Sequence, residues 1–151
     1  MRMVAQRDLR TMDRTILYAL ISMVFAGVTA VIAKLGMKNV SGDTALVVRT
    51  SLIFGLVWLN AFAFRHVQAL NLLTRKDYLF LGLSGVTTFL SWLFYYRAMK
   101  DGNVSVVATI DKASIVVTLL LSFWILKEPF TWRLAAGASL ILAGLVVLVW
   151  K

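Results

Sequence analysis

Five long apolar runs, separated by short polar segments, set the pattern of the chain. They cover residues 16–35, 44–64, 78–99, 104–126 and 134–150. Each run is long enough to cross about 30 Å of hydrocarbon as a helix that rises 1.5 Å per residue. Because a chain surrounded by lipid must satisfy its backbone hydrogen bonds internally, the pattern predicts an all-α integral membrane protein with five transmembrane helices. It divides the chain into a basic cytoplasmic segment over 1–15 and a membrane domain over 16–151.

The composition supports lipid as the solvent. Hydrophobic residues make up 60% of the 151 residues and charged residues 15%, whereas globular domains are about 45–50% apolar and about 25% charged. The net charge of +9 does not indicate nucleic-acid binding, because the basic residues flank apolar runs and form no stripe interleaved with aromatic residues. Without cysteine, and with one histidine and no acidic cluster, no metal or other cofactor is expected. The chain also offers no nucleophile–base pair, so we expect no enzyme activity.

The positions of lysine and arginine predict the orientation in the membrane. Nine lie on the side of the N-terminus: Arg2, Arg7, Arg10, Arg14, Arg65, Arg75, Lys76, Lys127 and Arg133. Five lie on the opposite side: Lys34, Lys38, Arg97, Lys100 and Lys151. This bias predicts a multi-pass protein of the inner (plasma) membrane with its N-terminus in the cytoplasm, and it is small enough to leave room for some inverted copies. A cleaved signal peptide would have a shorter apolar region than the first run.

Two charged residues, Asp111 and Lys112, interrupt the fourth run. Its 13 Val, Leu, Ile and Phe residues favour insertion by about 4–8 kcal/mol in total, whereas each charge opposes insertion by about 2.5–3.5 kcal/mol. Such a helix is more stable when its charges face a polar partner or a watery cavity. At 100° per residue, Asp111, Ser114 and Thr118 fall on one face. We therefore expect this face of the fourth helix to form a cavity wall.

Other charges lie at a similar depth. Arg49 lies about 8 Å below the outer end of the second helix, and Asp111 about 10 Å below that of the fourth. An arginine–carboxylate pair makes an intramembrane charge tolerable, so we expect these two to meet, with Lys34 near the same level. The alternatives are that Lys34 and Arg49 extend to the interface and that Asp111 and Lys112 form a static ion pair. The surplus of positive charge favours an anionic or zwitterionic ligand group.

Aromatic residues of the third helix offer a second candidate surface. Trp92 and Tyr96 are spaced four residues apart, with Tyr95 beside them. They are placed to stack on an apolar or cationic ligand, and they fit equally well as core or interfacial residues. With the charged residues of the second and fourth helices, they complete the predicted small-molecule site.

Small residues indicate where helices approach each other closely. Ala26, Ala30 and Ala33 share one face of the first helix. In the fifth helix, Ala135, Ser139 and Ala143 share one face, while glycines seven residues apart mark another. Such stripes favour close backbone contact within or between subunits, and we expect the fifth helix to form the seam of a homodimer.

The ordered features of the last two helices resemble an EamA domain of the drug/metabolite transporter superfamily. They run from YYRAMKDGN through the polar break IDKAS to an aliphatic run, Leu-x-Glu and a glycine-rich last helix. AKLG, Asp43 and VRT near the second helix are similar to the family version with a single five-helix domain. Two positions differ from the family pattern: Thr109 replaces a common proline before the break, and Lys127 replaces a common glycine before Glu128.

The resemblance implies a secondary transporter or exporter of a small metabolite or drug-like solute. Longer relatives have ten helices in two inverted halves around a central cavity, and this chain corresponds to one half. Because alternating access generally needs two repeats, a homodimer is implied, either antiparallel or parallel. The other functions to consider are a non-transporting membrane subunit or assembly partner, and a flippase for a lipid-linked substrate.

Overall fold

The computed structural model describes the backbone of residues 2–150 and the side chains from Arg14 onward, and this part of the chain is helical without a strand. The elements are α1 (Arg2–Gly36), α2 (Gly42–Ala63), η1 (His66–Leu72), α3 (Arg75–Asp101), α4 (Val104–Lys112), α5 (Ser114–Trp124) and α6 (Trp132–Val149). Five stretches are long and apolar enough to span a membrane, with α4 and α5 forming one of them together. The predicted all-α membrane fold with five spans is therefore confirmed.

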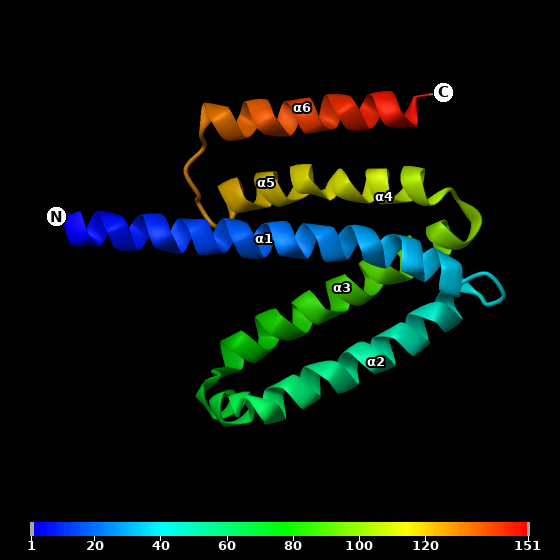
Figure 1. Ribbon diagram of the computed structural model, residues 1–151, viewed down its shortest axis with the longest axis horizontal. Helices are drawn as coiled ribbons and strands as arrows, with labels where there is room; N and C mark the ends of the chain where they lie inside the picture. Colours follow the sequence, from blue (N-terminus) through cyan, green and yellow to red (C-terminus); the bar gives the residue numbers. More distant parts are fainter. Residues whose placement is uncertain (1, 151) are drawn as a thin grey trace.

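The span limits differ from the predicted ones by a few residues. The first span covers Arg14–Gly36 and the third Arg75–Asp101. The backbone of α1 continues from this span back to Arg2, so the described part of the basic segment, residues 2–15, extends the first helix. The short 3₁₀ helix η1, which the apolar pattern did not indicate, joins α2 to α3. Five spans place the two termini at opposite ends of the molecule (Figure 1).

A break at Ala113 divides the fourth span. The Ala113 amide donates to the Ile110 carbonyl at 2.9 Å, and the Val116 amide donates to the Ala113 carbonyl at 3.0 Å. Both bonds reach back three residues, so the helix tightens here into a 3₁₀-type turn. No proline is present at this break, and α4 and α5 remain nearly in line (Figure 1). The polar break implied by the resemblance is therefore present, and it is gentle.

Side-chain caps mark where α2, α3 and α6 begin. The Ser41 hydroxyl accepts a hydrogen bond from the Thr44 amide at the start of α2. Thr74 and Asp77 form a capping box at the start of α3, and Thr131 caps α6. These side chains accept hydrogen bonds from amides that have no partner in the first helical turn. They therefore fix the residue at which each of these helices begins after its short connection.

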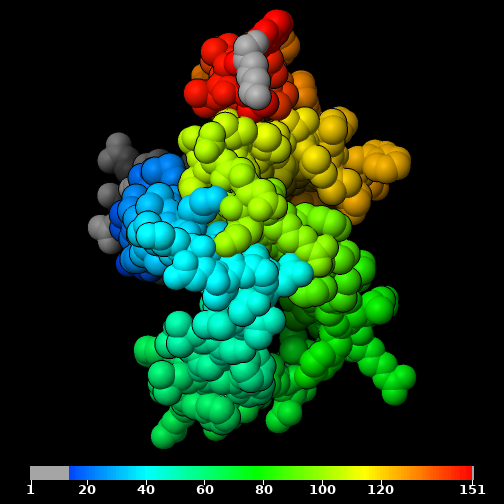
Figure 2. All heavy atoms as spheres, turned by 90° about the vertical axis from the view of Figure 1, so that its right-hand side faces the viewer, coloured from blue at the N-terminus to red at the C-terminus, as the bar shows by residue number. Residues whose placement is uncertain are grey.

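The buried core lies at one end of the bundle. Its members are Ala30, Met37, Leu46, Tyr96 and Met99. They gather where the C-terminal ends of α1 and α3 meet the start of α2, from which α2 and α3 diverge away from α1 (Figure 1). Seen from that end, α6 and the α2–α3 pair lie at opposite extremes of the molecule, with α1 and α4 between them (Figure 2). The exposed aliphatic and aromatic residues elsewhere suit helices that face lipid.

Two lysines hold the ends of α1 and α3 together. The Lys34 ammonium of α1 donates to the carbonyls of Met99, Lys100 and Gly102 at the end of α3. The Lys100 ammonium of α3 donates in return to the carbonyls of Met37 and Lys38. Each positive charge thus meets carbonyls that end the other helix, where the helix dipole is negative. We call this arrangement the lysine clamp.

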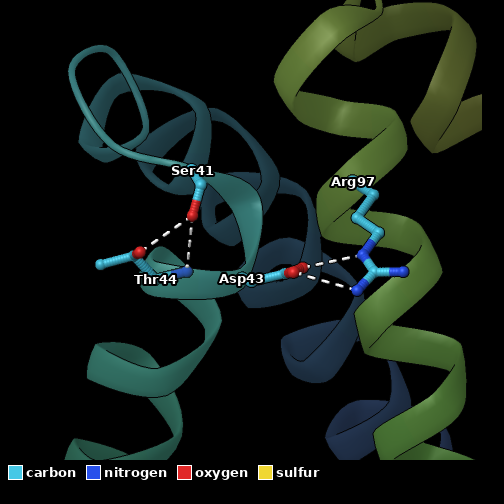
Figure 3. A network of polar contacts seen from close by, with 4 residues as sticks. All are labelled: Ser41, Asp43, Thr44 and Arg97. Carbon is cyan, nitrogen blue, oxygen red and sulfur yellow. Dashed lines mark hydrogen bonds and ion pairs between the residues drawn. The ribbon is translucent and has the colours of Figure 1, made fainter.

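A glycine and an ion pair set how α2 lies against α3. Gly42 is buried, and a Cβ atom added there would lie 2.6 Å from the Tyr96 carbonyl oxygen. One residue along, the Asp43 carboxylate receives two hydrogen bonds from the Arg97 guanidinium at 2.9 and 3.0 Å, beside the Ser41–Thr44 cap (Figure 3). Close backbone approach and a two-point ion pair together fix the relative register of these helices.

Candidate functional site

A cavity of about 190 Å³ lies between α1, α3 and α4, with Arg49 of α2 on its wall. Six of the predicted site residues line it: Arg49, Trp92, Tyr95, Tyr96, Asp111 and Lys112. They come from three different helices, so the fold brings together charged and aromatic residues that are up to 63 positions apart in sequence (from 49 to 112). We call this space the charged cavity.

The Arg49 side chain is held by two aromatic residues. Its Nη1 donates to the Tyr96 hydroxyl at 2.9 Å. Its guanidinium carbon lies 4.6 Å from the ring centroid of Trp92 and 5.5 Å from that of Tyr96, within the range of cation–π attraction. Tyr96 is only 1% exposed and therefore provides a rigid support. The predicted i, i+4 aromatic pair thus positions the arginine.

Asp111 pairs with its neighbour and not with Arg49. The Lys112 ammonium lies 3.3 Å from the Asp111 carboxylate. Arg49 and Asp111 line the same cavity, as their matching depths suggested, but the described side chains show no ion pair between them. The expected arginine–carboxylate pair is therefore not formed. Depth along two helices does not set the rotation of each helix, and rotation decides which side chains touch.

Three other predicted residues lie outside the charged cavity. Lys34 belongs to the lysine clamp. Ser114 and Thr118 lie beyond the break at Ala113, and the Thr118 hydroxyl donates to the Ser114 carbonyl of its own helix at 3.1 Å. The 3₁₀-type turn has fewer residues per turn than an α-helix, so it rotates α5 about the helix axis relative to α4. Ser114 and Thr118 therefore do not continue the face of Asp111 in the way that the 100° spacing had predicted.

Small and hydroxyl residues complete the wall of the charged cavity. Ala26, Ala30 and Ala33 of α1 contribute the stripe that was expected to mark close helix contact. Thr29 lies within the same helical segment, and Ser91 lies beside Trp92 on α3. Neither hydroxyl residue was among the predicted site residues. Thr29 could have been identified from its position, because it lies between Ala26 and Ala33, which mark the close-contact face of α1.

An apolar hollow of about 450 Å³ between α1 and α2 adjoins the charged cavity. Arg49 and Tyr96 line both spaces, as do Thr29 and Ala33. A larger hollow, about 510 Å³, lies between α5 and α6; most of its lining is apolar, and Ser122, Glu128 and Ser139 are its polar residues. We place the candidate site at the charged cavity, because Arg49, Asp111 and Lys112 line it. Charged side chains are unfavourable in lipid, so they mark a site more clearly than apolar walls do.

Comparison with known proteins gives two consistent findings. Residues 13–150 match the EamA-like transporter family. The chain is also 36% identical over 131 residues to a Sinorhizobium sp. protein named "Uncharacterized transporter in cobO 3'region", a match that covers 87% of this chain and 93% of that protein. No solved structure shows significant similarity to the chain. The match over nearly the whole membrane domain agrees with the five spans, and the chain therefore belongs to the EamA-like transporter family.

Proposed function

We propose that the protein is a secondary transporter that moves a small solute across the inner membrane, with its N-terminus in the cytoplasm. The observation that carries this proposal is the charged cavity, in which Arg49, Asp111 and Lys112 line one space inside the spans. Charges facing acyl chains are unfavourable by about 2.5 kcal/mol or more each, so a cavity that admits water explains their presence. Family membership and the transporter name of the Sinorhizobium relative support the same role.

The transporter works as a dimer in this proposal. Alternating access generally uses two repeats that rock about a shared site, and this chain supplies one five-span unit. Helix α6 lies at the edge of the molecule, with one face toward α4 and α5 and the other open (Figure 2). On the open side, Gly137 and Gly144 have no heavy atom within 4 Å of a Cβ built on them, and Leu140 is 74% exposed. This open face suits close contact with a second copy.

The dimer is tested by disulfide crosslinking, because the chain has no native cysteine. Leu140 lies at the midpoint of α6, where two copies of the helix meet whether they run parallel or antiparallel. Leu140→Cys should crosslink in membranes under mild oxidation. Leu142→Cys, two residues away and facing α5, should remain monomeric as the matched control. Equal crosslinking of both variants, or of neither, contradicts this seam.

The transport role is tested in proteoliposomes. Purified protein should accelerate the flux of at least one member of a panel of radiolabelled organic acids, amines and neutral solutes above that of protein-free vesicles. Arg49→Gln should reduce this flux by about tenfold or more, because a hydrogen bond to a charged group contributes about 1.5–3 kcal/mol. Asp111→Asn should also reduce the flux, because it breaks the Asp111–Lys112 pair. Arg133→Gln, which removes an exposed arginine at the start of α6, should leave it unchanged. Full flux in both cavity variants would show that the site is misplaced.

A tag on the C-terminus separates the two dimer arrangements. With the N-terminus in the cytoplasm and five spans, the tag lies outside the cell. An antiparallel dimer needs both orientations, so the tag should then be accessible from both faces of the membrane. Accessibility from the outer face alone indicates a parallel dimer.

A further inference from the structure

We infer that the charged cavity binds a hydrophobic organic monoanion and that Arg49 binds its anionic group. This inference rests on the proposed transport function and names the class of solute. It draws on the hydrogen bonds of Arg49, the charges around the cavity and the apolar hollow beside it.

Arg49 has donor groups to spare. A guanidinium carries five N–H donors, and within the described side chains Arg49 makes one hydrogen bond, to the Tyr96 hydroxyl. Neither of the ion pairs in this part of the chain involves Arg49. Arg49 is also only partly exposed, and its guanidinium rests against Trp92 and is bonded to Tyr96, so two contacts hold it before a ligand arrives. A fixed planar fork with free donors suits a carboxylate, which accepts two parallel hydrogen bonds.

The charges around the cavity leave one positive charge to be balanced. Lys112 and Asp111 form an ion pair on one wall, whereas Arg49 on another wall has no carboxylate partner among the described residues. A bound monoanion would neutralise the cavity. A monocation would instead raise its charge to two and would have to displace Lys112 from Asp111 to find a partner.

The direction of the guanidinium favours a solute over a lipid phosphate. Arg49 lies seven residues inside α2, about 10 Å from the helix end at Gly42. Its guanidinium carbon is closer to Trp92 than to Tyr96, and Trp92 is one turn farther from the end of α3. An arginine that extended to the headgroup region would turn toward the helix ends. The Arg49 guanidinium instead lies against Trp92 and Tyr96, on the wall of the charged cavity.

The apolar hollow between α1 and α2 provides room for the rest of the ligand. It is lined by aliphatic residues such as Ile32, Val48 and Leu52, and it opens beside Arg49 and Tyr96. An anionic group at Arg49 can therefore be joined to an apolar body lying in the adjacent space. Benzoate has this chemistry, and benzamide and benzylamine have nearly the same shape with neutral and positive charge.

Equilibrium dialysis with these three radiolabelled probes tests the inference, using the purified full chain in an uncharged detergent and protein-free micelles as the blank. Benzoate should bind at least tenfold more tightly than benzamide or benzylamine, and more tightly than acetate, which lacks the apolar body. Arg49→Gln should weaken benzoate binding at least tenfold, and Arg49→Lys, which keeps the charge without the planar fork, should weaken it less. Arg133→Gln, as the matched loss of an exposed arginine, should leave binding unchanged.

Several results would overturn the inference. They are equal binding of benzoate and benzamide, unchanged benzoate binding in Arg49→Gln, and no benzoate binding up to about 10 mM, the affinity expected of a weak ligand with nine heavy atoms. Acetate binding as tightly as benzoate would remove the apolar half of the site. Loss of benzoate binding when phosphatidylglycerol is added would transfer the site to a lipid headgroup, whereas unchanged binding supports a solute.

The binding test and the transport test can fail independently of each other. Benzoate binding that depends on Arg49, without flux of any solute in proteoliposomes, would leave the anion site in place and remove the transport role. Flux of a neutral or cationic solute without benzoate binding would do the reverse.

Discussion

Removing the Lys34 ammonium tests the lysine clamp most severely. Lys34 donates to three carbonyls at the end of α3, two of them at 3.0 Å, and all three bonds span at least 65 residues of sequence. Lys34→Met keeps the length and apolar stem of the side chain and removes the donors. The three carbonyls then lose their partner at a place where water reaches them only in part, because Lys34 is half-buried.

The expected loss follows from the strength of these bonds. A hydrogen bond from a charged donor contributes about 1.5–3 kcal/mol, and a cation at a helix C-terminus about 0.3–1 kcal/mol. Water partly replaces the ammonium at a half-buried site, so three bonds together should contribute about 2–3 kcal/mol to the free energy of unfolding. For a chain of this size, each kcal/mol shifts the melting temperature by about 2–4 °C, so Lys34→Met should lower it by about 4–12 °C.

Thermal unfolding in detergent, followed by circular dichroism, measures this loss. Lys38→Met is the matched control, because Lys38 is exposed and its ammonium makes no hydrogen bond or ion pair with the described residues. It should change the melting temperature by no more than about 2 °C, as surface substitutions usually do. If Lys34→Met has the melting temperature of the wild type, or if both variants lower it equally, the clamp does not hold α1 to α3.

Three further substitutions are measured by unfolding, and one of them by benzoate binding as well. Lys127→Gly should stabilise by about 0.5–1 kcal/mol, because Lys127 has a left-handed backbone (φ 54°) that glycine adopts without strain, and no gain would show that the turn after α5 is relaxed with lysine. Gly42→Ala should lower stability and weaken benzoate binding, because its Cβ would lie 2.6 Å from the Tyr96 carbonyl oxygen and force α2 away from α3. Unchanged binding would show that the position of Arg49 does not depend on this close approach. Lys100→Met should destabilise less than Lys34→Met, because Lys100 bonds to two carbonyls, at 2.7 and 3.3 Å. The double variant should lose less free energy of unfolding than the sum of the two single losses. Full additivity would show that the two lysines act independently.

The five spans could be predicted from the sequence because each depends only on the residues of its own segment. A run of about 20 apolar residues is sufficient evidence for a transmembrane helix, whatever its neighbours are. The break in the fourth span was implied by the family resemblance and not by the apolar pattern, which gave one run over 104–126. Most of the charged cavity could be anticipated for a related reason, since charged residues in lipid-spanning helices gather away from acyl chains.

The contacts inside the site could not be predicted, because they depend on helix rotation and on the distance between axes. Depth alone suggested that Arg49 meets Asp111, whereas Arg49 rests on Tyr96 and Trp92. The same reasoning placed Lys34 near the cavity, but its ammonium reaches three carbonyls exposed by the end of another helix. Acceptors of this kind belong to the backbone, so no side-chain pattern indicates them.

Labelling of a single cysteine at Ser91 tests most directly the central claim that the charged cavity holds water inside the membrane. Ser91 lines the cavity, and Phe89 lies at nearly the same depth on the opposite face of α3, where it is 55% exposed. Because the native chain has no cysteine, each variant carries one reactive site. In native membranes, Ser91→Cys should react with a water-soluble maleimide, as should Asn39→Cys in the connection after α1, whereas Phe89→Cys should not. An unreactive Ser91→Cys beside a reactive Asn39→Cys, or equal reactivity at Ser91 and Phe89, would contradict the account.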